Sequence, residues 1–107
     1  VDCGEVINPS GVEAQIEGGI AFGLTAALKD KITVKDGRVE QGNFDDFGIL
    51  RLDEMPTVEV YIVPSDRRAT GIGEMGVPPI VPAVLNAIYD ATGVRAREIP
   101  VKQVKGK

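Results

Sequence analysis

The stretch GIGEMGVPPIVPAVLNA, residues 71–87, is the most informative part of this 107-residue sequence. A single carboxylate, Glu74, lies among three glycines and apolar residues, and a proline-marked helix start follows. Glycines let a backbone approach a ligand closely. If Glu74 is buried, desolvation disfavours its ionised form, which suits a general base. From the spacing alone, an exposed turn glutamate with glycines that only reverse the chain is an equal alternative.

Gly71, Gly73 and Gly76 also match the pattern G-x-G-x-x-G of dinucleotide-binding sites. In those sites a strand runs directly into the glycine turn, and the helix opens inside the turn. Here seven residues separate Val63 from Gly71, and two prolines delay the helix until after the third glycine. We therefore reject a Rossmann-type site.

Working outward, a helix is predicted from about residue 10 to Lys29. Ser10 and Glu13 have capping-box spacing, and Asn8 with Pro9 offers an alternative start one turn earlier. An apolar stripe at four-residue intervals follows, as expected for a buried helix face. The stripe consists of Val12, Ile16, Ile20, Leu24 and Leu28.

Three glycines, Gly18, Gly19 and Gly23, interrupt this helix. Each costs about 1 kcal/mol relative to alanine in a helix interior, so another interaction must offset them. Close packing against a second backbone and contact with a cofactor explain them equally well.

The middle and end of the sequence predict strands. Residues 31–41 predict a β-hairpin around a two-residue type I′ turn at Asp36 and Gly37. Apolar and polar residues alternate over residues 57–63 and, more weakly, over residues 94–101. Such alternation is typical of half-buried strands, so two further strands are expected.

A second helix is expected between Pro79 or Pro82, in its first turn, and Gly93, where it stops. With a strand end at the N-terminus, the order is strand–helix–hairpin–strand–helix–strand. We therefore predict an α+β fold for residues 1–107, as one domain, in which two helices pack on a mixed, mostly antiparallel sheet.

The composition, 43% hydrophobic and 26% charged, is that of an ordinary globular chain. A net charge of −4 argues against a nucleic-acid surface. The sequence has no histidine and one cysteine, Cys3, which excludes His-based triads, His-containing or cysteine-cluster metal sites and an internal disulfide. No apolar run reaches the ~20 residues of a membrane span. We predict no metal ligand and no membrane span, and the compartment, cytoplasmic or periplasmic, stays open.

Several spaced motifs resemble one known family. They are DCG at residues 2–4, VEAQIEGG at residues 12–19, NFDD at residues 43–46 and GIGEMGVPP at residues 71–79. Together they resemble the xanthine dehydrogenase/aldehyde oxidase family, and more narrowly the C-terminal part of the molybdenum-binding large (beta) subunit of isoquinoline 1-oxidoreductase-type enzymes. The resemblance extends over essentially the whole sequence. We therefore expect a fragment of a longer subunit, a subdomain of a larger molybdenum-binding domain.

The resemblance implies a molybdenum hydroxylase, which hydroxylates an electron-poor carbon of an N-heteroaromatic or an aldehyde with water as the oxygen source. Glu74 matches the family's general base, and Gln15 matches a glutamine close to the pterin cofactor. Gly18 and Gly73 are implied as further cofactor-binding residues. Met75 departs from the family pattern, in which proline is more common at this position, so the turn is expected to be less rigid.

The same resemblance implies a cofactor and partners. The cofactor would be molybdenum–molybdopterin cytosine dinucleotide, and none is expected on the isolated chain, which would be inactive alone. The partners would be the remainder of the large subunit, a small [2Fe–2S] subunit and a small-molecule substrate. We also expect the isolated chain to self-associate through apolar surface such as residues 57–63. A non-catalytic, stand-alone α+β binding module is the alternative.

Overall fold

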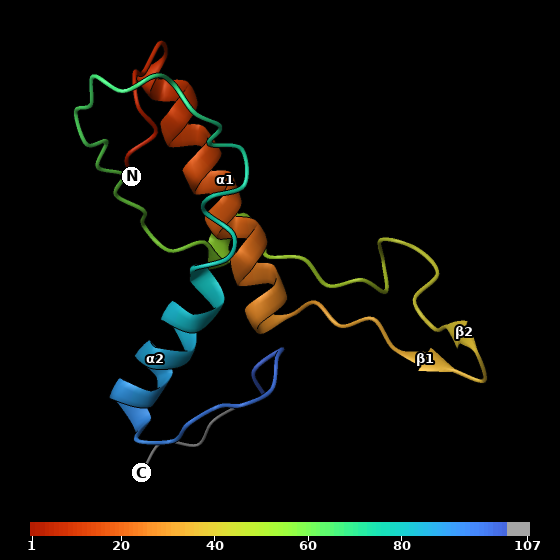
Figure 1. The fold of residues 1–107 in the computed structure, drawn as a ribbon. Coiled ribbons are helices and arrows are strands. Elements are labelled where there is room, and N and C mark those ends of the chain that lie inside the picture. The colour runs from red at the N-terminus through yellow and green to blue at the C-terminus, as the bar shows by residue number, and fades with distance from the viewer. Residues whose placement is uncertain (103–107) are drawn as a thin grey trace.

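Figure 1 shows the computed structural model, which describes residues 1–102. The elements in chain order are α1 (Pro9–Leu28), β1 (Val34–Lys35), β2 (Arg38–Val39), the short 3-10 helix η1 (Leu52–Glu54) and α2 (Ile80–Thr92). The two helices pack together, and the hairpin lies at the end of an arm that projects from them (Figure 1). The radius of gyration is 16.8 Å, whereas a compact chain of about 100 residues has about 13 Å. The shape is therefore extended.

α1 begins at the earlier of the two predicted positions because Asn8 caps it. Asn8 has an extended backbone, and its Oδ1 accepts a hydrogen bond from the backbone N–H of Gly11 at 3.2 Å. A proline follows at the first helical position, where no N–H is needed. Ser10 is inside the helix, and its hydroxyl donates to the same Asn8 oxygen. The predicted end near Lys29 is confirmed, since this residue is the C-cap.

The buried face of α1 is the face that carries the small residues. Gly19, Gly23, Leu24 and Ala27 are its buried residues. Of the predicted apolar stripe only Leu24 is buried, and Leu28 is 40% exposed. Val12, Ile16 and Ile20 are half-buried, so the stripe is covered only in part, and the loop lies most closely on the glycines instead.

α2 and the hairpin follow their sequence signals. Pro79 precedes the first residue of α2, and Gly93 ends the helix in a left-handed conformation with φ +70°, as predicted. In the hairpin β1 and β2 are antiparallel, with Val34 opposite Val39. The intervening Asp36 and Gly37 have φ values of 50° and 75°, which the type I′ turn requires.

The α+β class, the helix pair and the hairpin are confirmed, but the larger sheet is a correction. Within residues 1–102 the sheet has two strands, and residues 57–63 and 94–101 belong to neither. Residues 57–63 pair only towards their end, where the N–H of Val63 donates to the carbonyl of Val1 at 2.8 Å and the N-terminal ammonium of Val1 donates to the carbonyl of Tyr61 at 2.7 Å. Alternation encodes two different faces, but a strand also needs a neighbour along its whole length, and the described residues provide none. The helices therefore pack on each other rather than on a sheet.

Many large apolar side chains are exposed, and few are fully buried. The buried hydrophobic core of the described residues consists of Cys3, Leu24 and Ala27. Among residues 1–102 neither helix has the length and apolarity needed to cross a bilayer. The exposed large hydrophobic residues include Ile7, Phe22, Phe44, Leu52 and Tyr61.

Candidate active site

One cavity brings together the four residues predicted to form the site, Gln15, Gly18, Gly73 and Glu74. It has a volume of about 410 Å³, within the usual range for small-molecule sites. Gln15 and Gly18 reach it from α1, and Gly73 and Glu74 reach it from the loop that precedes α2. The two segments are far apart in the sequence, and Figure 1 shows that the loop runs beside α1. The lining is completed by Gly19, Phe22, Val77 and Pro78.

Two glycines of α1 let this loop lie directly on the helix. A Cβ on Gly19 would lie 3.1 Å from the Cα of Gly76, and a Cβ on Gly23 would lie 3.0 Å from the carbonyl oxygen of Val77. Such distances are tighter than nine in ten real Cβ contacts, so a side chain at either position would force the loop to shift by a few tenths of an ångström. Of the two explanations left open by the sequence, close backbone packing therefore accounts for Gly19 and Gly23.

The N-terminal segment holds the other end of the loop. The N–H of Thr70 donates to the carbonyl of Cys3 at 2.9 Å, and the N–H of Glu5 donates to the carbonyl of Arg67 at 2.8 Å. Within the loop, the N–H of Val77 donates to the carbonyl of Glu74 at 3.0 Å and closes a turn. Glu74 therefore lies on a turn that is fixed on both sides.

Gly18 and Gly73 differ from the packing glycines. A Cβ added to either would meet no atom within 4 Å, and both residues line the cavity. A side chain at either position would therefore project into free space that a ligand could use. The two glycines give the cavity a backbone-lined floor, where a flat group can approach closely.

The side chains of Gln15 and Glu74 are both exposed. The sequence left open whether Glu74 is buried among apolar neighbours, and the described residues do not bury it. They place it at the border of a cavity, with Gln15 on another side. The amide of Gln15 can donate and accept hydrogen bonds, and the carboxylate can accept them or take a proton.

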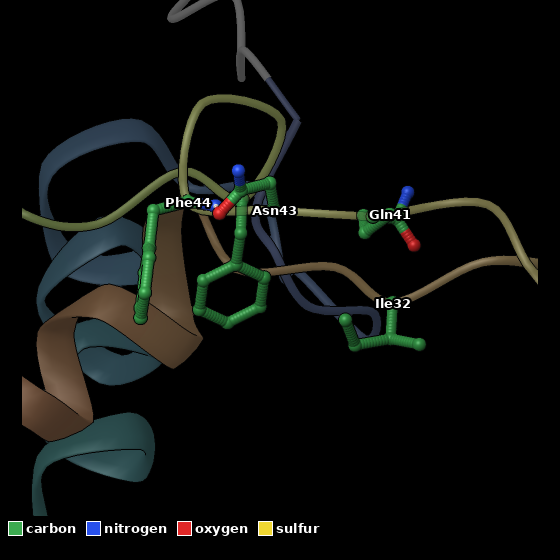
Figure 2. Close-up of a pocket in the computed structure, with 6 residues that line it drawn as sticks. Ile32, Gln41, Asn43 and Phe44 are labelled. Atoms are coloured by element: carbon green, nitrogen blue, oxygen red, sulfur yellow. Dashed lines mark hydrogen bonds between the residues drawn. The ribbon is translucent and has the colours of Figure 1, made fainter.

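A second hollow, of about 340 Å³, lies at the base of the arm and is shown in Figure 2. Its polar groups are already paired: the Gln41 side chain accepts from the N–H of Thr33 at 2.7 Å and donates to the Thr33 hydroxyl at 2.9 Å. The Asn43 side chain accepts from the N–H of Phe44 at 2.8 Å. With no titratable lining residue, this hollow is not the candidate site. Its lining residues are Ile32, Gln41, Gly42, Asn43, Phe44 and Phe47.

Comparison with known proteins identifies the family. The model of the molybdopterin cofactor-binding domain family matches residues 1–56 of this 107-residue chain. The chain belongs to this family.

Relatives of known name agree with a molybdopterin-binding domain. The chain is 38% identical to the beta subunit of isoquinoline 1-oxidoreductase of Brevundimonas diminuta, over 95% of its own length and 13% of the relative's. It is 34% identical to a nicotinate dehydrogenase subunit of Pseudomonas putida, over 94% of its own length and 8% of the relative's. Other relatives are named as xanthine dehydrogenase and aldehyde oxidoreductase subunits. The predicted resemblance is confirmed, and the chain spans a small part of these relatives.

Solved structures show the same arrangement. The chain superimposes on quinoline 2-oxidoreductase from Pseudomonas putida 86 with a TM-score of 0.78 and 28% identity, over 92% of this chain and 14% of that one. It superimposes on a Cu,Mo-CO dehydrogenase with a TM-score of 0.73 and 31% identity, over 84% of this chain and 12% of that one. The described fold is therefore a subdomain of large subunits of this kind.

The cavity is compatible with a molybdopterin-type cofactor. Its open glycine floor at Gly18 and Gly73 leaves room for a flat group, and the Gln15 amide matches a ring edge that carries donors and acceptors. The described residues contain no cluster of side chains that could hold a metal ion themselves.

The sequence analysis did not single out Phe22, which also lines the cavity. The helical spacing could have pointed to Phe22. Gly18 is three residues after Gln15 and Phe22 is four residues after Gly18, so all three share one face of α1. An aromatic residue in an apolar helix is ordinarily interpreted as core, and this signal was therefore overlooked.

Proposed function

We propose that this chain is the part of a molybdenum hydroxylase large subunit that supplies the general base, Glu74, and one side of the cofactor pocket. The observation that carries the proposal is the single cavity formed by Gln15, Gly18, Gly73 and Glu74. The relatives named above as isoquinoline, nicotinate, xanthine and aldehyde enzymes support it. The reaction is the hydroxylation of an electron-poor carbon, in an N-heteroaromatic ring or an aldehyde, with water as the oxygen source.

The chain's own residues have distinct roles in this proposal. The molybdenum cofactor, when bound, supplies the oxygen to be transferred and accepts an electron pair from the substrate. Glu74 accepts the proton that the oxygen nucleophile must lose, which a carboxylate at the border of the cavity can do once the site is closed. Gln15 fixes the cofactor edge through its amide, and Gly18 and Gly73 let the cofactor lie against bare backbone.

The remaining assignments concern what completes the site. This chain lines the cavity and leaves Glu74 exposed, so other parts of the large subunit must cover it and exclude water. The isolated chain is accordingly inactive and binds no cofactor by itself. By family resemblance, the cofactor is the cytosine dinucleotide form of molybdopterin, and a small [2Fe–2S] subunit takes the electrons.

The test is Glu74→Gln in the complete enzyme, since the amide keeps the size and removes the base. A general base contributes about 10²–10⁴-fold, so turnover should fall by at least a hundredfold while the molybdenum content stays near that of the wild type. Glu13→Gln is the matched control, because Glu13 is exposed on α1 and does not line the cavity. Turnover of Glu74→Gln within tenfold of the wild type would exclude the base role.

The alternative, a stand-alone binding module, predicts that the 107-residue chain folds cooperatively as a monomer. The structure favours the subunit instead, because side chains such as Phe44 and Leu52 are about 90% exposed. Apolar surface of this extent promotes association. Light scattering of the isolated chain should therefore detect dimers or larger species, and a clean monomer at high concentration would support the module.

A further inference from the structure

Phe22 occupies the end of the cavity opposite to Gln15. The two residues are seven positions apart on α1, which is about two helical turns or 10 Å. Gly18 and Gly19 lie between them on the same face and also line the cavity. Along the helix, the cavity therefore runs from a polar amide, across bare backbone, to an aromatic ring.

The Phe22 ring is uncovered although its neighbours are packed. Its side chain is 74% exposed, whereas Leu24 is only 7% exposed. The next residue, Gly23, is in close contact with the start of α2, since a Cβ there would lie 3.0 Å from the Cβ of Ile80. The loop is seated on Gly19 and Gly23, and Phe22 remains among the residues that line the cavity.

Apolar groups from the loop complete this end of the cavity. Val77 and Pro78 line it together with Phe22, and Glu74 lies on the same loop within one turn. Ligand pockets are lined mainly by apolar and aromatic side chains with a few polar groups that fix the orientation of the ligand, and this end of the cavity has that composition.

We propose that Phe22 is a specificity-determining residue, whose ring is the stacking surface for a planar N-heteroaromatic substrate held beside Glu74. The inference rests on the proposed function and names the substrate class of that site. The face of a phenyl ring is the negative part of its quadrupole, and it pairs best with a ring that is poor in electrons. An aliphatic aldehyde has no such face, so Phe22 discriminates between the two substrate classes.

The experiment compares two probes, isoquinoline and acetaldehyde, on the complete enzyme. Phe22→Leu keeps the apolar volume and removes the ring, whereas Phe22→Tyr keeps the ring. Phe44→Leu is the matched control, because Phe44 is also an exposed phenylalanine and lines the other hollow. Steady-state kinetics give KM and kcat for both probes, and calorimetric titration of the Glu74→Gln enzyme with isoquinoline gives Kd with and without Phe22→Leu.

Phe22→Leu should raise both KM and Kd for isoquinoline by about fivefold to tenfold, the value of one aromatic pair. Its kcat/KM for acetaldehyde should change by less than twofold, and its molybdenum content should match the wild type. Phe22→Tyr should restore the isoquinoline values, and Phe44→Leu should leave them unchanged.

Three outcomes would overturn the inference: an equal effect of Phe22→Leu on both probes, a loss of molybdenum with no change in Kd, or a wild-type enzyme that does not bind isoquinoline. Each of these can occur while Glu74→Gln is inactive. The failure of this inference is therefore distinguishable from the failure of the base role.

Discussion

Gly19 of α1 and Gly76 of the loop before α2 lie backbone to backbone. A Cβ on Gly76 would lie 2.8 Å from the carbonyl oxygen of Ile16 and 3.3 Å from the Cα of Gly19. This contact is the crossing point between the two segments that form the cavity, and it determines how far Glu74 lies from Gln15.

Gly76→Ala should therefore separate the loop from α1. The backbone of Gly76 is not left-handed, so the effect is purely steric, and overpacking of this kind costs about 1–3 kcal/mol. In the complete enzyme we expect a lower thermal unfolding midpoint and a lower molybdenum content. Gly71→Ala is the control, because a Cβ there meets nothing within 4 Å. Equal behaviour of the two variants would contradict the crossing-point role.

Gly4 and Gly37 form a second matched pair. Both have φ +75°, but a Cβ on Gly4 would lie 2.3 Å from the carbonyl oxygen of Arg68, whereas a Cβ on Gly37 meets nothing within 4 Å. Both alanine variants incur the left-handed backbone cost of about 1–2 kcal/mol. Gly4→Ala should add about 1–3 kcal/mol of steric cost. Thermal unfolding should therefore rank Gly4→Ala well below Gly37→Ala, and a tie would show that the N-terminal segment moves freely.

The N-cap of α1 gives a third prediction. Asn8→Ala removes the side chain that accepts from the Gly11 N–H and should cost about 1 kcal/mol. Ser10→Ala should have little effect, because Ser10 is already helical. Hydrogen exchange of the amides at residues 10–13 should accelerate in the first variant alone. Faster exchange in Ser10→Ala would favour the capping box at Ser10 instead.

The ion pair between Lys29 and Glu54 predicts a pH dependence. The pKa of Glu54 lies below its ordinary value of 4.5, chiefly because Lys29 donates to the carboxylate and secondly because the backbone N–H of Arg51 does. The stabilisation is therefore complete above pH 4.5 and is lost as the pH falls through the lowered folded-state pKa.

Glu54→Gln should accordingly unfold at a lower temperature than the wild type at neutral pH, and the difference should disappear in acid. The pair is exposed, so the difference should also shrink in high salt. Asp53→Asn, at the neighbouring acid, is the control, because it leaves the pair between Lys29 and Glu54 intact. A Glu54→Gln difference that persists below the folded-state pKa would contradict the ion-pair interpretation.

Local signals in the sequence predicted the elements that need no distant partner. Gly93 stops α2, and Asp36 with Gly37 turns the hairpin, because the required backbone angles are properties of those residues. Local signals could not determine whether residues 57–63 form a strand. Their alternation is real, but their hydrogen-bond partners are not among the described residues beyond Val1.

The candidate site, like the fold, could be predicted only in part from the sequence. The motifs pointed to Gln15, Gly18, Gly73 and Glu74, and the structure brings all four to one cavity. The sequence could not distinguish Gly19, which packs against the loop, from Gly18, which faces open space. The two residues are adjacent in α1 and differ only in what the fold places beside them. Only the path of the loop across α1 distinguishes them. The sequence motifs did not point to Phe22, which also lines the cavity.

In the sequence, the hairpin arm lies between α1 and the loop before α2, the two segments that form the cavity. It contributes no residue to the lining of that cavity. Its length therefore does not by itself set the distance between Gln15 and Glu74, and loop closure adds only about 0.6 kcal/mol per doubling of the length. Insertions at the Asp36–Gly37 turn can add a label or a docking element to such a subunit while the distance between Gln15 and Glu74 stays the same.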